Sequence, residues 1–101
     1  NEYDKAIPLL ESLRKKGQPS ADVLAALGWC RWNSSSQGDA EDVIMLALTF
    51  ESGHEAALEY AAKISISQGK VRRAKKRLMR LLQVNPKHSW ARTTYSSLKD
   101  H

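Results

Sequence analysis

The chain carries one pattern twice, in residues 21–54, ADVLAALGWCRWNSSSQGDAEDVIMLALTFESGH, and in residues 55–88, EAALEYAAKISISQGKVRRAKKRLMRLLQVNPKH. Small and apolar residues recur at a fixed offset of 34, which also reaches back into residues 1–20. A period of about 20–50 residues is typical of stacked repeats, in which each unit buries its apolar face against its neighbours. The recurring sets are Ala6, Ala40 and Ala74; Leu10, Ile44 and Leu78; Leu13, Ala47 and Leu81; Leu24 and Leu58; Gly28 and Ala62; Leu48 and Leu82; and Phe50 and Val84.

Apolar residues follow the spacing of α-helices along the whole chain. Residues 3–13 show the i, i+3, i+4, i+7 spacing of one helix face, and Pro8 is expected near the first turn, where its missing N–H costs least. A second helix, capped by Ser20 or Asp22, is expected to run to Trp32. Four more have their apolar stripes in residues 40–48, 57–64, 71–82 and 90–98. Six helices, no strand candidate and short polar joints predict an all-α fold of antiparallel helix pairs.

This pattern resembles the tetratricopeptide repeat, a 34-residue helix-turn-helix unit. Residues 21–54 match it with Leu27-Gly28, Ala40, Ile44 and Ala47, and residues 55–88 with Leu58, Ala61-Ala62, Ala74, Leu78, Leu81 and Pro86. The chain departs from the family pattern at Leu24 and Leu58, which replace a Trp, at Arg31 and Ser65, which replace a Tyr, and at Ser52, which replaces the closing Pro. The resemblance implies a right-handed superhelix of stacked helix pairs, an α-solenoid.

We expect residues 1–101 to form a single domain, because a chain of this length has room for one core. Residues 1–20 are interpreted as the second helix of a truncated repeat, residues 21–54 and 55–88 as repeats, and residues 89–101 as a capping helix. The incomplete first repeat predicts that the chain is a piece of a longer protein. It also makes residues 3–13 a candidate surface for self-association.

The composition leaves several classes of partner open. The net charge of +5 keeps nucleic acid, membrane surfaces and acidic proteins on the list. No apolar run approaches the roughly 20 residues that span a bilayer, and the acidic start does not resemble a signal peptide. Cys30 is the only cysteine, so we expect a small, semi-buried filler on a helix rather than a disulfide or a zinc ligand. A lone thiol fits a reducing compartment, which favours a cytoplasmic location.

No catalytic pattern is recognisable, so we expect neither an enzyme nor a cofactor. The sequence contains no Gly-rich phosphate loop, no His-Glu-x-x-His and no Cys-x-x-Cys. His54 and His88 share a slot in successive repeats, which invites a metal interpretation. Packed helices lie about 8–10 Å apart, so two histidines at this separation are too far apart to hold one metal ion without further ligands. The histidines are therefore expected to fill the joints between repeats.

The first candidate site is the concave groove, which the first helices of tetratricopeptide repeats line. The resemblance therefore implies binding of a partner's peptide or helix there, with Trp29 and Trp32 as anchors, because two tryptophans off the core stripe suit that role. The alternative is that these rings are core residues, with Trp32 filling the space above the Ser-rich turn. The residues on the outward stripes are Asp22, Ala25, Trp29, Trp32, Ala56, Glu59, Lys63, Ile66 and Trp90.

One subfamily of these repeats grips the C-terminal carboxylate of chaperone tails with Lys, Asn and Arg on the inner stripe. Lys63 is the only cation on the matching stripe of this chain. A carboxylate clamp of that kind is therefore not expected. Instead, Trp, Glu and Lys favour an extended or helical segment with apolar anchors.

The second candidate site is a basic run on the fifth helix, which the resemblance places on the convex side. It fits an acidic protein, nucleic acid or anionic lipid, but it also fits a solvated face partly neutralised by the acidic helix beside it. No aromatic residue interleaves the run, so it lacks stacking platforms for single-stranded nucleic acid. The seven cations are Lys70, Arg72, Arg73, Lys75, Lys76, Arg77 and Arg80.

Together these patterns predict a non-enzymatic scaffold or adaptor module for protein–protein interaction, with the partner's peptide or helix in the groove. The first alternative is an electrostatic adaptor that uses residues 70–80. The second is a structural segment of a longer repeat array.

Overall fold

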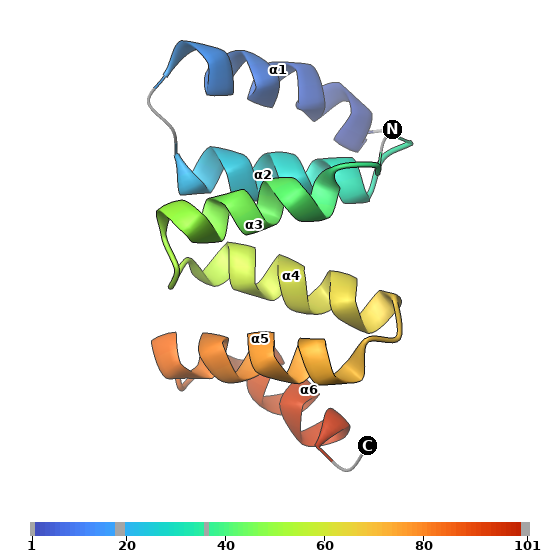
Figure 1. Cartoon of the computed structure of the whole chain (residues 1–101), viewed down its shortest axis with the longest axis vertical. Coiled ribbons are helices and arrows are strands. Elements are labelled where there is room, and N and C mark those ends of the chain that lie inside the picture. The colour runs from blue at the N-terminus through green and yellow to red at the C-terminus, as the bar shows by residue number, and fades with distance from the viewer. Residues whose placement is uncertain (1, 18–19, 36, 100–101) are drawn as a thin grey trace.

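The structure, a computed structural model, describes residues 2–17, 20–35 and 37–99. Within these ranges the chain forms six α-helices and no β-strand, which confirms the expected all-α fold. The helices follow one another down the long axis of a body 43 × 26 × 19 Å in extent (Figure 1). They are α1 (Glu2–Lys16), α2 (Ala21–Trp32), α3 (Ala40–Phe50), α4 (Glu55–Ser67), α5 (Val71–Val84) and α6 (Ser89–Leu98).

The predicted turns lie where these helices end, although Gln18, Pro19 and Ser36 fall outside the described residues. The last two residues of the predicted capping segment 89–101 also fall outside them. None of the described helices is both long enough and apolar enough to cross a bilayer.

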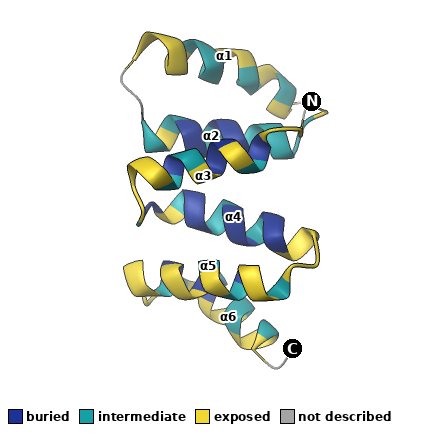
Figure 2. Cartoon of the chain, in the orientation of Figure 1, coloured by how far each residue is buried: buried dark blue, intermediate teal, exposed yellow. Residues whose placement is uncertain are grey.

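Each helix packs against the next one along the chain, and α2 also packs against α4. One buried cluster joins α2, α3 and α4 through residues such as Leu27, Ile44 and Ile64. A second joins α4, α5 and α6 through Leu58 and Leu78. Because α4 contributes side chains to both clusters, it connects the two halves of the core. Figure 2 shows buried residues on each helix from α2 to α6, whereas α1 has none.

Small residues allow close helix packing, as the sequence predicted. Gly28 of α2 lies against α3, and a Cβ built at this position would meet Ile44 Cγ1 at 2.4 Å and the Ala40 carbonyl oxygen at 3.0 Å. Ala40 and Ala74, which share a slot at the 34-residue offset, are both fully buried. Such residues let two helix axes approach where larger side chains would hold them apart.

Of the two residues expected to cap α2, Ser20 is the one that does so. Ser20 adopts an extended conformation, and its hydroxyl accepts a hydrogen bond from the Val23 N–H at 3.4 Å. Asp22 lies within the first turn of the helix and contacts His54 instead. Farther along α2, Arg31 forms ion pairs with Glu11 of α1 and, at 3.3 Å, with Asp39 before α3.

The position of Pro8 in α1 differs from the expectation. Because the helix begins at Glu2, Pro8 lies in its second turn rather than in its first. The helix therefore forms with one intrahelical hydrogen bond fewer, which the first-turn placement would have avoided.

Candidate functional site

Two aromatic rings from different helices stack on each other. The centroids of Trp29 on α2 and Tyr60 on α4 are 4.6 Å apart, and the ring planes are 8° from parallel. Both residues are half-buried and pack against the first core cluster. Stacked aromatic pairs stabilise more than their buried area alone, so this pair holds Trp29 in one orientation.

Lys63 of α4 lies beside two indole rings. Its Nζ is 5.5 Å from the ring centroid of Trp29 on α2 and 5.2 Å from that of Trp90 on α6. Both distances are within the range of a cation–π interaction. The structure thus brings together three of the predicted groove residues from three helices. We call Trp29, Tyr60, Lys63 and Trp90 the indole–lysine cluster.

Glu59 links the lysine of this cluster to His88. Glu59 Oε2 accepts a hydrogen bond from Lys63 Nζ at 2.8 Å, and Glu59 Oε1 lies 3.0 Å from His88 Nε2. The ring of His88 meets Trp90 edge-on, with centroids 6.3 Å apart and planes at 71°. The predicted groove residues Glu59, Lys63 and Trp90 are therefore part of one connected network.

Tyr60 is the member of the cluster that the sequence analysis missed. A signal for it was present, because Tyr60 lies four residues after Ala56 and three before Lys63, on the predicted stripe of α4. Burial raises the pKa of the Tyr60 phenol, and the neighbouring Glu59 carboxylate raises it further, against a smaller lowering by Lys63.

Ala25 is a correction to the predicted groove. It was expected on the outward stripe of α2, but it is 1% exposed and belongs to the first core cluster. The reason is that α2 packs against α1, α3 and α4, so more than one of its faces is covered. Ala25 therefore offers no surface to a partner.

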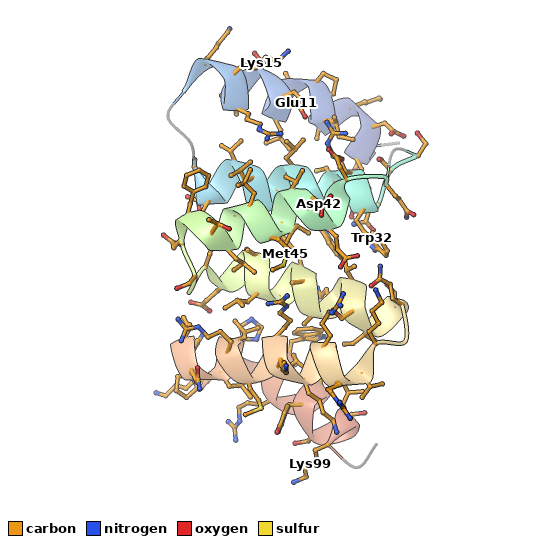
Figure 3. The ribbon with its side chains drawn as sticks, in the orientation of Figure 1. Glu11, Lys15, Trp32, Asp42, Met45 and Lys99 are labelled. Atoms are coloured by element: carbon orange, nitrogen blue, oxygen red, sulfur yellow. The ribbon has the colours of Figure 1, made fainter. Side chains whose placement is uncertain are left out.

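The remaining predicted groove residues lie outside the cluster. Trp32 is half-buried at the C-terminal end of α2, where it packs against the first core cluster (Figure 3). Ala56 is half-buried on α4, and Ile66, near the end of that helix, is 36% exposed. Asp22 is exposed, and its Oδ1 lies 2.5 Å from His54 Nε2. No ring contact joins Trp32 to the cluster in the described part of the chain.

The two histidines, which were expected to fill joints between repeats, cap helices in the structure. His54 Nδ1 accepts a hydrogen bond from the Ala57 N–H at 3.1 Å, and His88 Nδ1 accepts one from the Ala91 N–H at 3.2 Å. Each Nε2 reaches back to a carboxylate of an earlier helix, Asp22 of α2 or Glu59 of α4. Among the described residues no group of three or more His, Cys, Asp or Glu could hold a metal ion.

Cys30 is half-buried on α2, as the sequence predicted. Burial raises the pKa of its thiol. The thiol is the reactive group only as a thiolate, so this environment makes Cys30 a poor nucleophile near neutral pH.

The second candidate surface lies on α5, and we call Lys70, Arg72, Arg73, Lys76, Arg77 and Arg80 the α5 cation surface. Ala74, Leu78 and Leu81 of this helix are buried, whereas the cations of this surface are exposed except for Arg77, which is half-buried. Arg73 Nη1 lies 3.6 Å from Glu41 Oε2 of α3. Arg77 Nη2 lies 3.3 Å from the sulfur of Met45, and Arg80 Nη2 lies 3.5 Å from the Ser52 hydroxyl. This surface therefore adjoins α3, whereas the indole–lysine cluster joins α2, α4 and α6.

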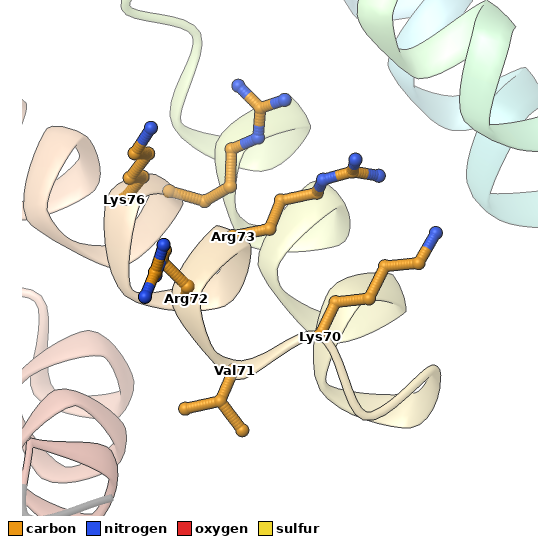
Figure 4. Close-up of a pocket in the computed structure, with 6 residues that line it drawn as sticks. Lys70, Val71, Arg72, Arg73 and Lys76 are labelled. Carbon is orange, nitrogen blue, oxygen red and sulfur yellow. The ribbon is translucent and has the colours of Figure 1, made fainter.

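Five of these cations line an open depression of about 730 Å³ at the start of α5 (Figure 4). Val71 is its one apolar lining residue. Depressions of this size hold small ligands, and the lining would favour an anion.

Comparison with protein-family models, with curated proteins and with solved structures found no match for the chain. The resemblance to tetratricopeptide repeats therefore rests on the residues quoted above.

Proposed function

We propose that the chain is a non-enzymatic module that binds a peptide or helix of a partner protein on the surface formed by α2, α4 and α6. The observation that carries this proposal is the indole–lysine cluster. Trp29, Lys63 and Trp90 come from three different helices, yet the lysine lies within 5.5 Å of both indole centroids. Aromatic side chains clustered on one partly exposed surface are common anchors in protein interfaces.

The finer fold that we propose is a stack of helix pairs of the tetratricopeptide type. Equivalent slots in the two repeats support it. Ile44 and Leu78 are buried at the 34-residue offset, and so are Ala47 and Leu81. His54 and His88 cap α4 and α6 with the same atom and the same partner position, three residues farther on. The packing of α2 on α4 fits the lateral contact between successive first helices.

The cluster favours a ligand with apolar anchors and few charges. Lys63 is already paired with Glu59, and Glu59 also contacts His88, so their charges largely compensate each other. What remains for a partner is mainly the partly exposed surface of the indole rings, which prefer apolar or aromatic side chains. Glu59 and Lys63 would orient the segment by charge, since each keeps a partly exposed side chain.

The test is a selection of peptides from a random library displayed on phage, with the folded chain as bait. Selected peptides are then titrated against the wild type, Trp29→Leu, Trp90→Leu and Trp32→Leu. The last variant is the matched control, because Trp32 packs on the core but has no ring contact with the cluster in the described residues. Circular dichroism establishes that each variant is folded.

We expect Trp29→Leu and Trp90→Leu each to weaken binding by about tenfold or more, as for central aromatic residues of interfaces, and Trp32→Leu to weaken it less than about threefold. Peptides that bind all four proteins equally would contradict the proposal. Failure to select any peptide that binds the wild type would also contradict it.

A further inference from the structure

The depression at the start of α5 is unusually rich in one sign of charge. Figure 4 shows Lys70 and Arg73 extending in a similar direction from the first turn, with Arg72 and Lys76 beside them and Val71 pointing away. The depression has a volume of about 730 Å³, within the range of about 300–1,000 Å³ that is usual for small-molecule sites. The residues that line it are Lys70, Val71, Arg72, Arg73, Lys76 and Arg77.

Most of this charge is not neutralised within the described part of the chain. Among the described residues, the side chains of Lys70, Arg72 and Lys76 form no hydrogen bond or ion pair, and Arg73 contacts one carboxylate, Glu41, at 3.6 Å. The Arg77 guanidinium contacts the sulfur of Met45 at 3.3 Å. Two cations elsewhere in the described residues are better matched, since Arg31 pairs with two carboxylates and Lys63 with one at 2.8 Å.

The arrangement is unfavourable for the helix itself. Arg72 and Lys76 are four residues apart, as are Arg73 and Arg77, and like charges at this spacing repel each other on one face of a helix. α5 contains no acidic residue that would compensate them. Local conflicts of this kind are expected mainly at functional sites, and a bound anion would remove the repulsion.

The lining residues indicate which anion. No aromatic, amide or carboxylate side chain lines the depression, so it offers no aromatic platform on which a base could stack. Val71 is the one apolar lining residue, and it points away from the labelled cations, so the depression offers little to an apolar ligand body (Figure 4). Three arginines remain, and a guanidinium group binds phosphate oxygens through two parallel hydrogen bonds. We infer that this depression binds a compact ligand with two or more phosphate groups.

Such phosphates have two chemical sources, a soluble polyphosphate compound or the phosphorylated headgroup of a lipid. The apolar residues Ala74, Leu78 and Leu81 of α5 are buried, so α5 cannot insert them into a bilayer. Met79 and Val84 are exposed apolar residues of α5, but neither lines the depression, so a lipid held there would be bound through its headgroup. The site is also separate from the indole–lysine cluster, which joins α2, α4 and α6.

The experiment is a calorimetric titration of the whole chain with tripolyphosphate at about 0.15 M salt, where exposed charges are partly screened. The site variant is Arg72→Gln/Lys76→Gln, because neither side chain has a partner in the described residues whose loss would disturb the fold. The matched control is Lys15→Gln/Lys16→Gln on α1, which lowers the net charge equally and removes two exposed lysines. We expect the site variant to weaken binding by at least about tenfold and the control by less than about twofold.

Equal weakening by both variants would overturn the inference, because bulk charge alone would then explain binding. So would the absence of binding by the wild type, or equal binding of a glutamate oligomer. A double-stranded DNA oligomer that binds more tightly than tripolyphosphate, and loses affinity with Arg80→Gln as well, would make the surface a nucleic-acid interface instead.

Phosphatidylcholine vesicles with and without a bisphosphorylated inositol lipid distinguish the two sources. Sedimentation only with the phosphorylated lipid, reversed by tripolyphosphate, assigns the headgroup. Binding of tripolyphosphate without sedimentation assigns a soluble ligand. Trp29→Leu should leave both measurements unchanged, which separates this site from the proposed peptide surface.

Discussion

Trp29 on α2 and Tyr60 on α4 form a nearly parallel ring stack, with centroids 4.6 Å apart. The stack contributes directly to the contact between these two helices, which are not neighbours along the chain. It also fixes the indole before any partner arrives. An anchor that is already ordered loses less conformational entropy on binding, which is an advantage for an interaction surface.

The stack should be measurable as a coupling between its two residues. In a double-mutant cycle of Trp29→Leu and Tyr60→Leu, we expect a coupling of about 0.5–1.5 kcal/mol in the free energy of unfolding in urea. The control pairs Trp29→Leu with Tyr95→Leu, because Tyr95 packs against the second core cluster instead. If the coupling energy of the Tyr60 cycle were as small as that of the control cycle, the stack would add nothing to stability beyond the burial of its rings.

Tyr60 should also make stability depend on alkaline pH. Burial and the nearby Glu59 raise the pKa of its phenol, so the folded chain keeps this proton at pH values where the unfolded chain, with a pKa of about 10, loses it. The contribution to stability is complete below the unfolded pKa and is lost as the pH rises through the folded pKa. Between about pH 8 and 11, the free energy of unfolding in urea should therefore fall more for the wild type than for Tyr60→Phe.

Cys30 must be removed from this comparison, because burial raises the pKa of its thiol as well. Both proteins should therefore carry Cys30→Ala. If the proteins with Tyr60 and with Tyr60→Phe lost the same stability as the pH rises, the Tyr60 phenol would not be the cause of the pH dependence.

The helices and their turns were predictable because apolar spacing and turn residues are local signals. The same signals placed Trp29, Lys63 and Trp90 on the second, fourth and sixth helices. Apolar spacing does not give side-chain rotamers or distances between helices, so the convergence of these three residues was not predictable. Ala25 illustrates the limit. It shares a stripe with Trp29, yet it is buried, because one stripe cannot reveal that a helix is covered on several sides.

His54 is expected to stabilise α4 through its side-chain cap. His54→Ala removes the acceptor of the Ala57 N–H and should lower the free energy of unfolding by about 1–2 kcal/mol, as for other lost caps. His54→Asn should recover part of this, because asparagine caps helices well but loses the Asp22 contact. Thermal unfolding followed by circular dichroism measures both variants.

Lys70→Ala is the matched control, since Lys70 occupies the cap position of α5 without a side-chain cap bond. It should change stability little. If the alanine and asparagine variants of His54 were equally unstable, the cap would not be the source of the loss.

Gly28 should tolerate no side chain. A Cβ there would lie 2.4 Å from Ile44 Cγ1 and 3.0 Å from a backbone oxygen, so Gly28→Ala requires the Ile44 side chain or the two helices to shift. We expect a loss of about 1–3 kcal/mol in the free energy of unfolding, measured in urea. Gly38→Ala, which has no atom within 4 Å of the new Cβ, should have little effect. A Gly28→Ala protein as stable as the control would show that these helices do not depend on their close approach.

The apolar face of α1 should promote self-association. Leu9 is 70% exposed and Leu13 is 56% exposed. Ala47 of α3 and Leu81 of α5, which correspond to Leu13 at the 34-residue offset, are fully buried. The mass from sedimentation equilibrium should therefore rise over about a hundredfold range of concentration, because association follows mass action.

Leu9→Lys/Leu13→Lys should abolish that rise without loss of helix content, since neither side chain is buried. Met79→Lys/Val84→Lys is the control, because it adds two charges at exposed apolar positions of α5. If both variants prevented association equally, the added positive charge would be the cause rather than the loss of the α1 face. If neither did, the contact would lie elsewhere on the molecule.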